Sequence, residues 1–355
     1  MNLPPLVIGD LIASVPIIQG GMGVGISGYK LASAVANEGA VGIISGAQIG
    51  YREPDFITNT KEANIRALRK EIRKAKEISP NGIIGVNLMV ATNNYGEMVK
   101  ACIEENADLI ISGAGLPLLL PKFALGSNIK IAPIVSSGKA ASIICKMWKR
   151  HNRCPDLIVV EGPEAGGHLG FHREDLNNPM SLDDIVTEVI NEVKVFEEFY
   201  NKKIPVVAAG GVYDGRDIAR LIKLGASGVQ MATRFVATFE CDADIKYKEE
   251  YIKCKKEDIE IIISPVGMPG RAIRNDFIKR VEQGRIPPDK CFQCLKKCNP
   301  KETPYCITRA LVDAVNGNVD NALIFTGSNA YRIDKIVSVK NLIDELKNDA
   351  AKNLN

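Results

Sequence analysis

The sequence predicts an α/β protein built on a closed (β/α)8 TIM barrel, followed by a small cysteine-containing domain or lid. Two observations lead to this fold class. Short apolar, β-branched runs recur eight times between helix-like segments, and most of them end in glycine or a small polar residue. Such near-continuous apolar runs indicate parallel strands that are covered on the outside. The length agrees, because a barrel takes about 250 residues and the chain has 355.

The predicted strands alternate with segments of helical composition. In order, the strands are residues 15–19, 40–46, 82–89, 109–113, 131–137, 157–160, 205–211 and 228–232. Helices are predicted at 30–37, 61–77 and 98–105. A doubly wound sheet would alternate in the same way. However, Gly21-Met22-Gly23-Val24-Gly25 lacks the GxGxxG spacing and the downstream acidic residue of a dinucleotide-binding fold.

The composition changes near residue 240, where a charged stretch and then a turn-rich stretch replace the strand-helix alternation. We therefore predict three parts. Residues 1–240 form the barrel and 241–320 form the appended lid or cysteine-rich region. Residues 321–355 form a C-terminal segment whose final helix, 337–346, packs back on the barrel.

Composition and charge exclude several classes of protein. The net charge is +3, and no lysine-arginine run is interleaved with aromatic residues, so a nucleic-acid partner is not expected. We find no signal peptide and no apolar run long enough to span a membrane. Nine cysteines without a secretion signal indicate a reducing cytoplasm. A homodimer stays an open alternative.

The loop after the sixth strand, residues 161–170, is the first candidate for chemistry. It holds His168, one of only three histidines in the chain, between glycines. Barrel enzymes keep their chemistry at the carboxyl ends of the strands, and histidine exchanges a proton near neutral pH. His168 is therefore the candidate acid or base; the alternative is that it caps a helix or bonds a carbonyl. Glu161, at the strand end, is a candidate to bond a ligand or orient an amide, and Glu164 is expected to face solvent or the lid.

Two late loops suit a phosphate group. Ala208-Ala209-Gly210-Gly211-Val212 follows the seventh strand and Gln230-Met231-Ala232-Thr233 the eighth, where barrels hold phosphate with backbone N–H groups. At the other end of such a ligand, Gly21-Met22-Gly23 and Asn87 offer backbone groups and an amide, which suit the edge of a heteroaromatic ring. The alternatives are that the glycines only turn the chain and that Asn87 caps a helix.

Taken in order, these motifs resemble the nitronate monooxygenases, formerly 2-nitropropane dioxygenases, and equally their relatives, the FMN-dependent enoyl-acyl carrier protein reductases. The motifs are Gly20-Gly21-Met22-Gly23, Gly85-Val86-Asn87, Glu164-Ala165-Gly166-Gly167-His168-Leu169-Gly170, Ala208-Ala209-Gly210-Gly211-Val212 and Gln230-Met231-Ala232-Thr233-Arg234-Phe235. The resemblance covers residues 6–239, and residues 264–275 resemble the reductase branch in particular.

The resemblance implies a barrel that binds FMN non-covalently at the carboxyl ends of its strands. The positions that match the family's motifs, together with Glu161 at a strand end, give the expected cofactor residues. They are Gly21, Met22, Gly23, Asn87, Glu161, Gly166, Gly211, Gln230, Met231, Ala232 and Thr233. His168 falls on the family's active-site histidine.

Three activities follow as expectations. In the monooxygenase branch, which we favour, His168 would help draw electrons from an alkyl nitronate into the flavin, which then meets oxygen. In the reductase branch, the first alternative, NAD(P)H reduces FMN and an enoyl thioester receives the hydride, as in fatty-acid synthesis. The alternative from another class is a barrel that binds a phosphorylated ligand without redox chemistry, although the strand ends lack the lysine or paired carboxylates typical of such enzymes.

One feature departs from the family pattern. Cys291, Cys294, Cys298 and Cys306 place four thiols in a short window, which suits zinc or an iron–sulfur cluster. Their spacing matches no common cluster motif, and cysteine is also a small buried hydrophobe, so both interpretations stay open. Arg271 is a candidate to hold an anionic substrate; the alternative is an ordinary surface arginine.

Overall fold

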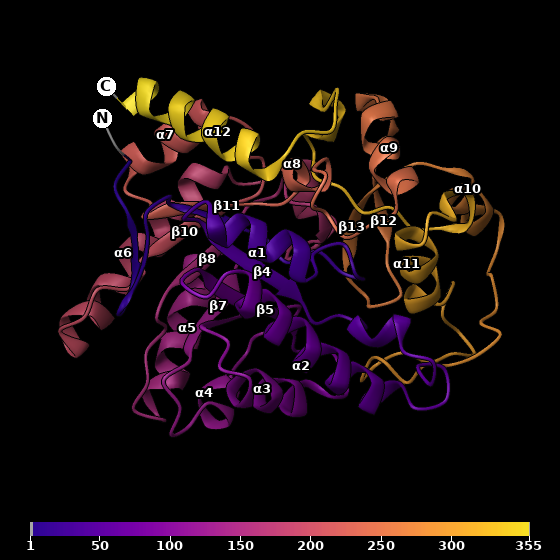
Figure 1. Cartoon of the computed structure of the whole chain (residues 1–355), viewed down its shortest axis with the longest axis horizontal. Helices are drawn as coiled ribbons and strands as arrows, with labels where there is room; N and C mark the ends of the chain where they lie inside the picture. Colours follow the sequence, from indigo (N-terminus) through magenta and orange to yellow (C-terminus); the bar gives the residue numbers. More distant parts are fainter. Residues whose placement is uncertain (1–2, 355) are drawn as a thin grey trace.

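The computed structural model describes residues 3–354 and confirms the predicted barrel (Figure 1). Its parallel strands close in the order β10-β11-β3-β4-β5-β6-β7-β8. In chain order they are β3 (Ile17–Gln19), β4 (Val41–Ser45), β5 (Ile83–Met89), β6 (Leu109–Gly113), β7 (Lys130–Val135), β8 (Ile158–Glu161), β10 (Val206–Ala209) and β11 (Gly228–Met231). Each predicted strand overlaps one of them, and the ends differ by no more than two residues.

Helices cover the outside of the barrel. They are α1 (Tyr29–Asn37), α2 (Thr60–Ile78), α3 (Tyr95–Glu104), α4 (Leu120–Phe123), α5 (Gly138–Lys149), α6 (Leu182–Tyr200), α7 (Gly215–Leu224) and α8 (Thr233–Val236). The predicted helices at 30–37, 61–77 and 98–105 correspond to α1, α2 and α3. Short 3-10 helices are η1 (Ile49–Arg52), η2 (Asp175–Asn177), η3 (Lys256–Asp258), η4 (Val319–Asn321) and η5 (Ala330–Arg332). In residues 3–354, the helices are too short or too polar to cross a bilayer.

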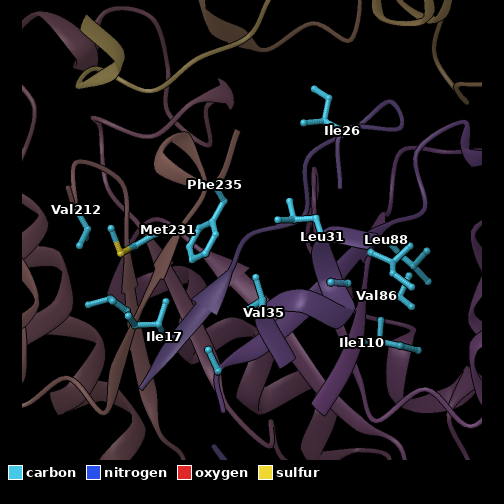
Figure 2. Close-up of a cluster of buried hydrophobic side chains, with 14 of the residues drawn as sticks. Ile17, Ile26, Leu31, Val35, Val86, Leu88, Ile110, Val212, Met231 and Phe235 are labelled. Carbon is cyan, nitrogen blue, oxygen red and sulfur yellow. The ribbon is translucent and has the colours of Figure 1, made fainter. Parts of the chain in front are cut away.

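The main apolar core lies between the strands and the covering helices. Figure 2 shows side chains of strands, such as Ile17, Val86 and Ile110, in one cluster with Leu31 and Val35 of α1. All five are fully buried. Because each square ångström of apolar surface removed from water contributes about 25 cal/mol, this layer of contacts holds the helices on the barrel.

An antiparallel hairpin covers the amino ends of the barrel strands. It consists of β1 (Leu6–Ile8) and β2 (Leu11–Ala13). Leu6 and Ile8 are fully buried, in a cluster with Val41, Ile83 and Leu109 at or near the first residues of three barrel strands. The hairpin therefore closes the end of the barrel opposite the predicted chemistry.

The chain after residue 240 contains α9 (Ile245–Lys253), β12 (Ile259–Ile263), β13 (Pro269–Ile273), α10 (Asp276–Gln283), α11 (Ile307–Val315) and α12 (Val339–Leu354). Figure 1 shows α9, α10 and α11 grouped at one side of the barrel. The final helix, α12, is longer than predicted and packs against α7. Our division of the chain at residues 240 and 320 stays a prediction.

The strands β12 and β13 tie this late part of the chain to the barrel. They form a three-stranded antiparallel sheet with β9 (Gly167–His168), in which Gly270 pairs with His168. The amide of Leu169 also donates to the carbonyl of Pro269 at 2.9 Å. The loop that carries the predicted acid or base is therefore held by residues about a hundred positions later in the chain.

The packing of α12 on α7 depends on a well-capped α7. The Asp214 carboxylate accepts the amides of Arg216 and Asp217, and the Asp217 carboxylate accepts the amide of Asp214 in return. Such a capping box satisfies amides that would otherwise lack a partner in the first turn.

We expect Asp214→Ala to lower the free energy of unfolding by about 1 kcal/mol, because the first turn of α7 loses its acceptor. Urea titration followed by circular dichroism measures the change. Asp214→Asn is the matched control, since asparagine is also a good cap, and it should retain most of the stability. Equal losses in the two variants would contradict the capping role.

Candidate functional site

A cavity of about 1050 Å³ opens at the carboxyl ends of the barrel strands. Its lining includes the residue at or just after the end of every barrel strand, namely Gly20, Ser45, Met89, Gly113, Val135, Glu161, Ala209 and Met231. It also includes the whole predicted set: His168, Gly21, Met22, Gly23, Asn87, Glu161, Gly166, Gly211, Gln230, Met231, Ala232 and Thr233. The structure thus brings all the predicted cofactor and acid-base residues to one cavity, while their roles stay predictions.

The loop after β3 presents bare backbone to this cavity. A Cβ at Gly21 would collide with the side chain of Asn87, and one at Gly23 would lie 2.7 Å from Cβ of Ala47. The loop is held by Gln19, which is fully buried; its Oε1 accepts the amide of Ile43 at 3.1 Å. Glycine is therefore required here by close approach, and the backbone stays open to a ligand.

The side-chain amides of Gln230 and Asn87 line the cavity and can form further hydrogen bonds. Within the part of the chain that the structure describes, Oε1 of Gln230 is buried and has no hydrogen-bond partner. Asn87 makes no side-chain hydrogen bond with any residue in 3–354 and lies inside β5, so the alternative that it caps a helix is wrong. A buried polar atom without a partner is costly, and a polar ligand would satisfy it.

The loop after β10 has a backbone conformation that requires glycine at two positions. Gly210 and Gly211 have φ values of +93° and +83°, which only glycine adopts without strain. A Cβ at Gly210 would also lie 3.0 Å from the amide nitrogen of Ala165. The loops after β8 and β10 are therefore packed backbone against backbone.

Sequence reasoning missed one wall of the cavity, formed by Gly327, Ser328 and Asn329. The side chain of Asn329 donates to the carbonyl of Gly211 at 2.8 Å, and a Cβ at Gly327 would lie 2.5 Å from Oγ1 of Thr233. The signal was present, because residues 322–325 form an apolar run that ends in small and polar residues, as the barrel strands do. We predicted that this run returns to the barrel but assigned none of its residues to the site.

Glu164 lies beside this wall. Its exposed carboxylate accepts the Ser328 hydroxyl at 3.2 Å and occupies the space next to Gly211. It therefore faces the open cavity.

His168 is held in a specific environment. Its Nε2 lies 2.6 Å from Oγ of Ser264, and its ring meets the edge of Phe325 at 4.8 Å between centroids. Neither alternative from the sequence, a helix cap or a bond to a carbonyl, describes this contact. Burial lowers the pKa of His168 to about 4, so the imidazole is neutral at pH 7.

Glu161 ends β8 with its carboxyl group in the same cavity. Its Oε2 accepts the amide of Gly170 at 3.0 Å, and Ser136 lies beside it. Burial raises the pKa of Glu161 to about 7, against the smaller opposing effects of the Gly170 amide, Ser136 and the charge of Arg271. Burial thus lowers the pKa of His168 and raises the pKa of Glu161. Opposite pKa shifts of two neighbouring groups are typical of catalytic sites.

Arg271 is not an ordinary surface arginine. Its guanidinium donates to the carbonyl of Ala165, and burial lowers its pKa. Because its own backbone pairs with Gly167 across β9 and β13, Arg271 holds the loop that carries His168.

The raised pKa of Glu161 predicts a pH-dependent stability. Below pH 4.5, the ordinary carboxyl pKa, Glu161 is protonated in both the folded and the unfolded protein. Between about pH 4.5 and 7 it is protonated only in the folded protein, so the free energy of unfolding falls as pH rises through this range. We expect Glu161→Gln, which cannot ionise, to gain stability relative to the parent between pH 5 and 8 in thermal denaturation of flavin-free protein. The exposed Glu198→Gln is the control, and a difference that stays flat with pH would contradict the prediction.

The four clustered cysteines are not arranged as a metal centre. Over residues 3–354, no group of three or more His, Cys, Asp or Glu side chains is placed to hold a metal ion. Backbone hydrogen bonds join this segment to the loop after β5: the amide of Asn93 donates to the carbonyl of Cys294, and the amide of Lys296 to that of Ala91. Cys294 packs in the apolar cluster of the C-terminal part, as the small-hydrophobe interpretation expects.

Comparisons with known proteins agree with this geometry. A family model described as nitronate monooxygenase matches residues 7–349. The chain is 26% identical to (3aS,4S,5R,7aS)-5-hydroxy-7a-methyl-1-oxo-octahydro-1H-indene-4-carboxyl-CoA dehydrogenase of Rhodococcus jostii, over 96% of this chain and 93% of that protein. It is 30% identical to a probable nitronate monooxygenase of Staphylococcus haemolyticus, over 77% of this chain and 79% of the relative. The structure of FabK from Thermotoga maritima superposes with a TM-score of 0.74 at 28% identity, covering 96% of this chain and 94% of FabK.

Proposed function

Since the chain belongs to the nitronate monooxygenase family, whose enzymes are flavin-dependent oxidoreductases, we propose that it binds FMN and oxidises alkyl nitronates with molecular oxygen. The observation that carries the proposal is the shared cavity. There, amides without a hydrogen-bond partner among residues 3–354 and bare backbone suited to a flat polar ring lie with the half-buried His168, whose pKa is lowered to about 4. The non-redox alternative does not fit membership of this family.

The residues present fit FMN. The backbone of Gly21, Met22 and Gly23, with the free amides of Asn87 and Gln230, would hold the ring. Gly211 and Thr233 would hold the phosphate, and Gly166, Met231 and Ala232 would line the ring and the ribityl chain. When bound, FMN supplies the acceptor and donor of electrons, and the protein positions it.

Glu164 must move for the phosphate to bind. Its carboxylate lies against Gly211, and two negative groups in contact repel. The side chain is exposed, so rotation toward solvent removes the conflict.

His168 would meet the substrate. A nitronate is an anion whose charge lies on the two oxygens of its nitro group. A neutral imidazole donates a hydrogen bond to such an oxygen without a second charge being buried in the cavity. Glu161, whose pKa burial raises to about 7, is a carboxyl group of this cavity that can gain or lose a proton near neutral pH.

A second candidate is NAD(P)H-dependent reduction of an enoyl thioester. The similarity to FabK over nearly the whole chain supports the same candidate, as does the relative named as a carboxyl-CoA dehydrogenase.

An anaerobic absorbance titration tests the proposal. Purified protein receives propane 2-nitronate in one sample and NADH or NADPH in another. Bleaching of the flavin by the nitronate alone supports the monooxygenase. Rapid bleaching by a nucleotide, followed by reoxidation with an enoyl thioester, would replace it by the reductase, and the absence of a flavin band would contradict both.

We further infer a cytoplasmic location and keep the homodimer as a proposal. The location is supported by the nine cysteines, all of which are free, as expected in a reducing compartment. Size-exclusion chromatography with light scattering measures the oligomeric state.

A further inference from the structure

Ser264 lies at the turn between β12 and β13 and reaches the ring of His168 from the late part of the chain. It is 2% exposed. Its backbone is fixed on both sides, because its amide donates to the carbonyl of Met268 and its carbonyl accepts the amide of Gly267. The Oγ···Nε2 distance to His168 is 2.6 Å, a short hydrogen bond.

The position of the hydrogens in this bond follows from the available partners. Oγ of Ser264 already accepts the amide of Val266, at 3.5 Å. Among residues 3–354, the only acceptor within reach of its hydroxyl hydrogen is Nε2 of His168. If Nε2 donated instead, the buried hydroxyl hydrogen would have no partner, which is costly. The hydroxyl therefore donates, and Nε2 accepts.

A neutral imidazole carries a single hydrogen on one of its two nitrogens. We propose that Ser264 fixes His168 in the tautomer with its hydrogen on Nδ1, which makes His168 a hydrogen-bond donor to an oxygen atom of the substrate. Nδ1 makes no hydrogen bond with any residue that the structure describes, and His168 lines the cavity. Ser264 is thus a positioning residue, acting through the ring.

This inference rests on the proposed function and narrows it. A donor at Nδ1 suits a substrate with an exposed acceptor oxygen, such as the nitro group of a nitronate or the carbonyl of a thioester. It does not suit removal of a proton from carbon, because the only basic nitrogen of this tautomer is occupied by Ser264. The preferred substrate is therefore already an anion or a polarised carbonyl.

Nitrogen-15 NMR of the flavin-loaded protein tests the tautomer directly. The chain has only three histidines, so His168→Ala identifies the signal of that ring. We expect hydrogen on Nδ1 in the parent and in Ser264→Thr, and a mixture of tautomers in Ser264→Ala. Ser33→Ala is the matched control, since Ser33 is equally buried but lies in α1 and bonds only the carbonyl of Lys30.

Turnover supplies the second measurement. Loss of one such hydrogen bond should reduce turnover about tenfold in Ser264→Ala, with little change in Ser264→Thr or Ser33→Ala. Hydrogen on Nε2 in the parent, a charged ring at neutral pH, or an Nδ1 tautomer that persists in Ser264→Ala would each overturn the inference. Because the NMR result does not depend on the substrate, it separates failure of this inference from failure of the proposed function.

Discussion

Replacing His168 by alanine is expected to leave the flavin bound and to reduce nitronate turnover by about 10²- to 10³-fold, the usual effect of removing one donor to a reacting oxygen. Flavin should stay because most of its expected contacts lie in the loops after other strands. Flavin content by absorbance and steady-state oxygen consumption measure the two effects.

The variant His168→Gln distinguishes hydrogen-bond donation by His168 from proton transfer. Glutamine keeps an N–H donor but cannot titrate, so it should retain more turnover than alanine if His168 donates a hydrogen bond. Equal losses in the two variants would instead favour proton transfer. His151→Ala is the control, because His151 is exposed and does not line the cavity. Unchanged turnover in His168→Ala would show that the residue is misassigned.

Gly21→Val is expected to weaken FMN binding by about 10- to 100-fold, since overpacking costs roughly 1–3 kcal/mol. A Cβ at Gly21 would collide with the side chain of Asn87 and lie 3.2 Å from Ile43. The new side chain would therefore displace the backbone and the amide that we expect to hold the ring. Titration of flavin-free protein with FMN, followed by fluorescence quenching, measures the affinity.

Gly284→Val controls for the general effect of replacing glycine. No atom lies within 4 Å of a Cβ at Gly284, and Gly284 does not line the cavity. Its FMN affinity should match the parent. If Gly21→Val also bound FMN normally, the ring would not lie on the loop after β3, and the proposed placement of the cofactor would be wrong.

The barrel was predictable because its signals are local. Each strand is a short, mainly apolar run, such as 109–113, and the strand ends of a barrel meet in space by necessity. Placing His168, Asn87 and Gln230 around one cavity required only that rule. The N-terminal hairpin was missed, because β1 and β2 have only three residues each, too few for a clear alternation of apolar and polar residues.

The remaining wall of the site depends on contacts between segments that lie about a hundred residues apart in the sequence. The strand β9 has two residues and exists only because β13 pairs with it. Asn329 reaches the cavity from a turn. Ser264 reaches the ring of His168 from another turn, and neither residue carries a periodic signal. For the cysteine cluster, proximity in sequence suggested a shared ligand, but in residues 3–354 no group of three or more such side chains is placed to hold a metal ion.

The sheet that joins β9 to β13 also sets the order in which the protein can become active during its synthesis. His168 and Ser264 are 96 residues apart in the chain, and Gly211 and Asn329 are 118 apart. All eight barrel strands leave the ribosome before Ser264 does, so a nascent chain can close its barrel while the cavity still lacks one wall. Flavin colour in a growing chain would therefore report that nearly the whole protein has been made and folded.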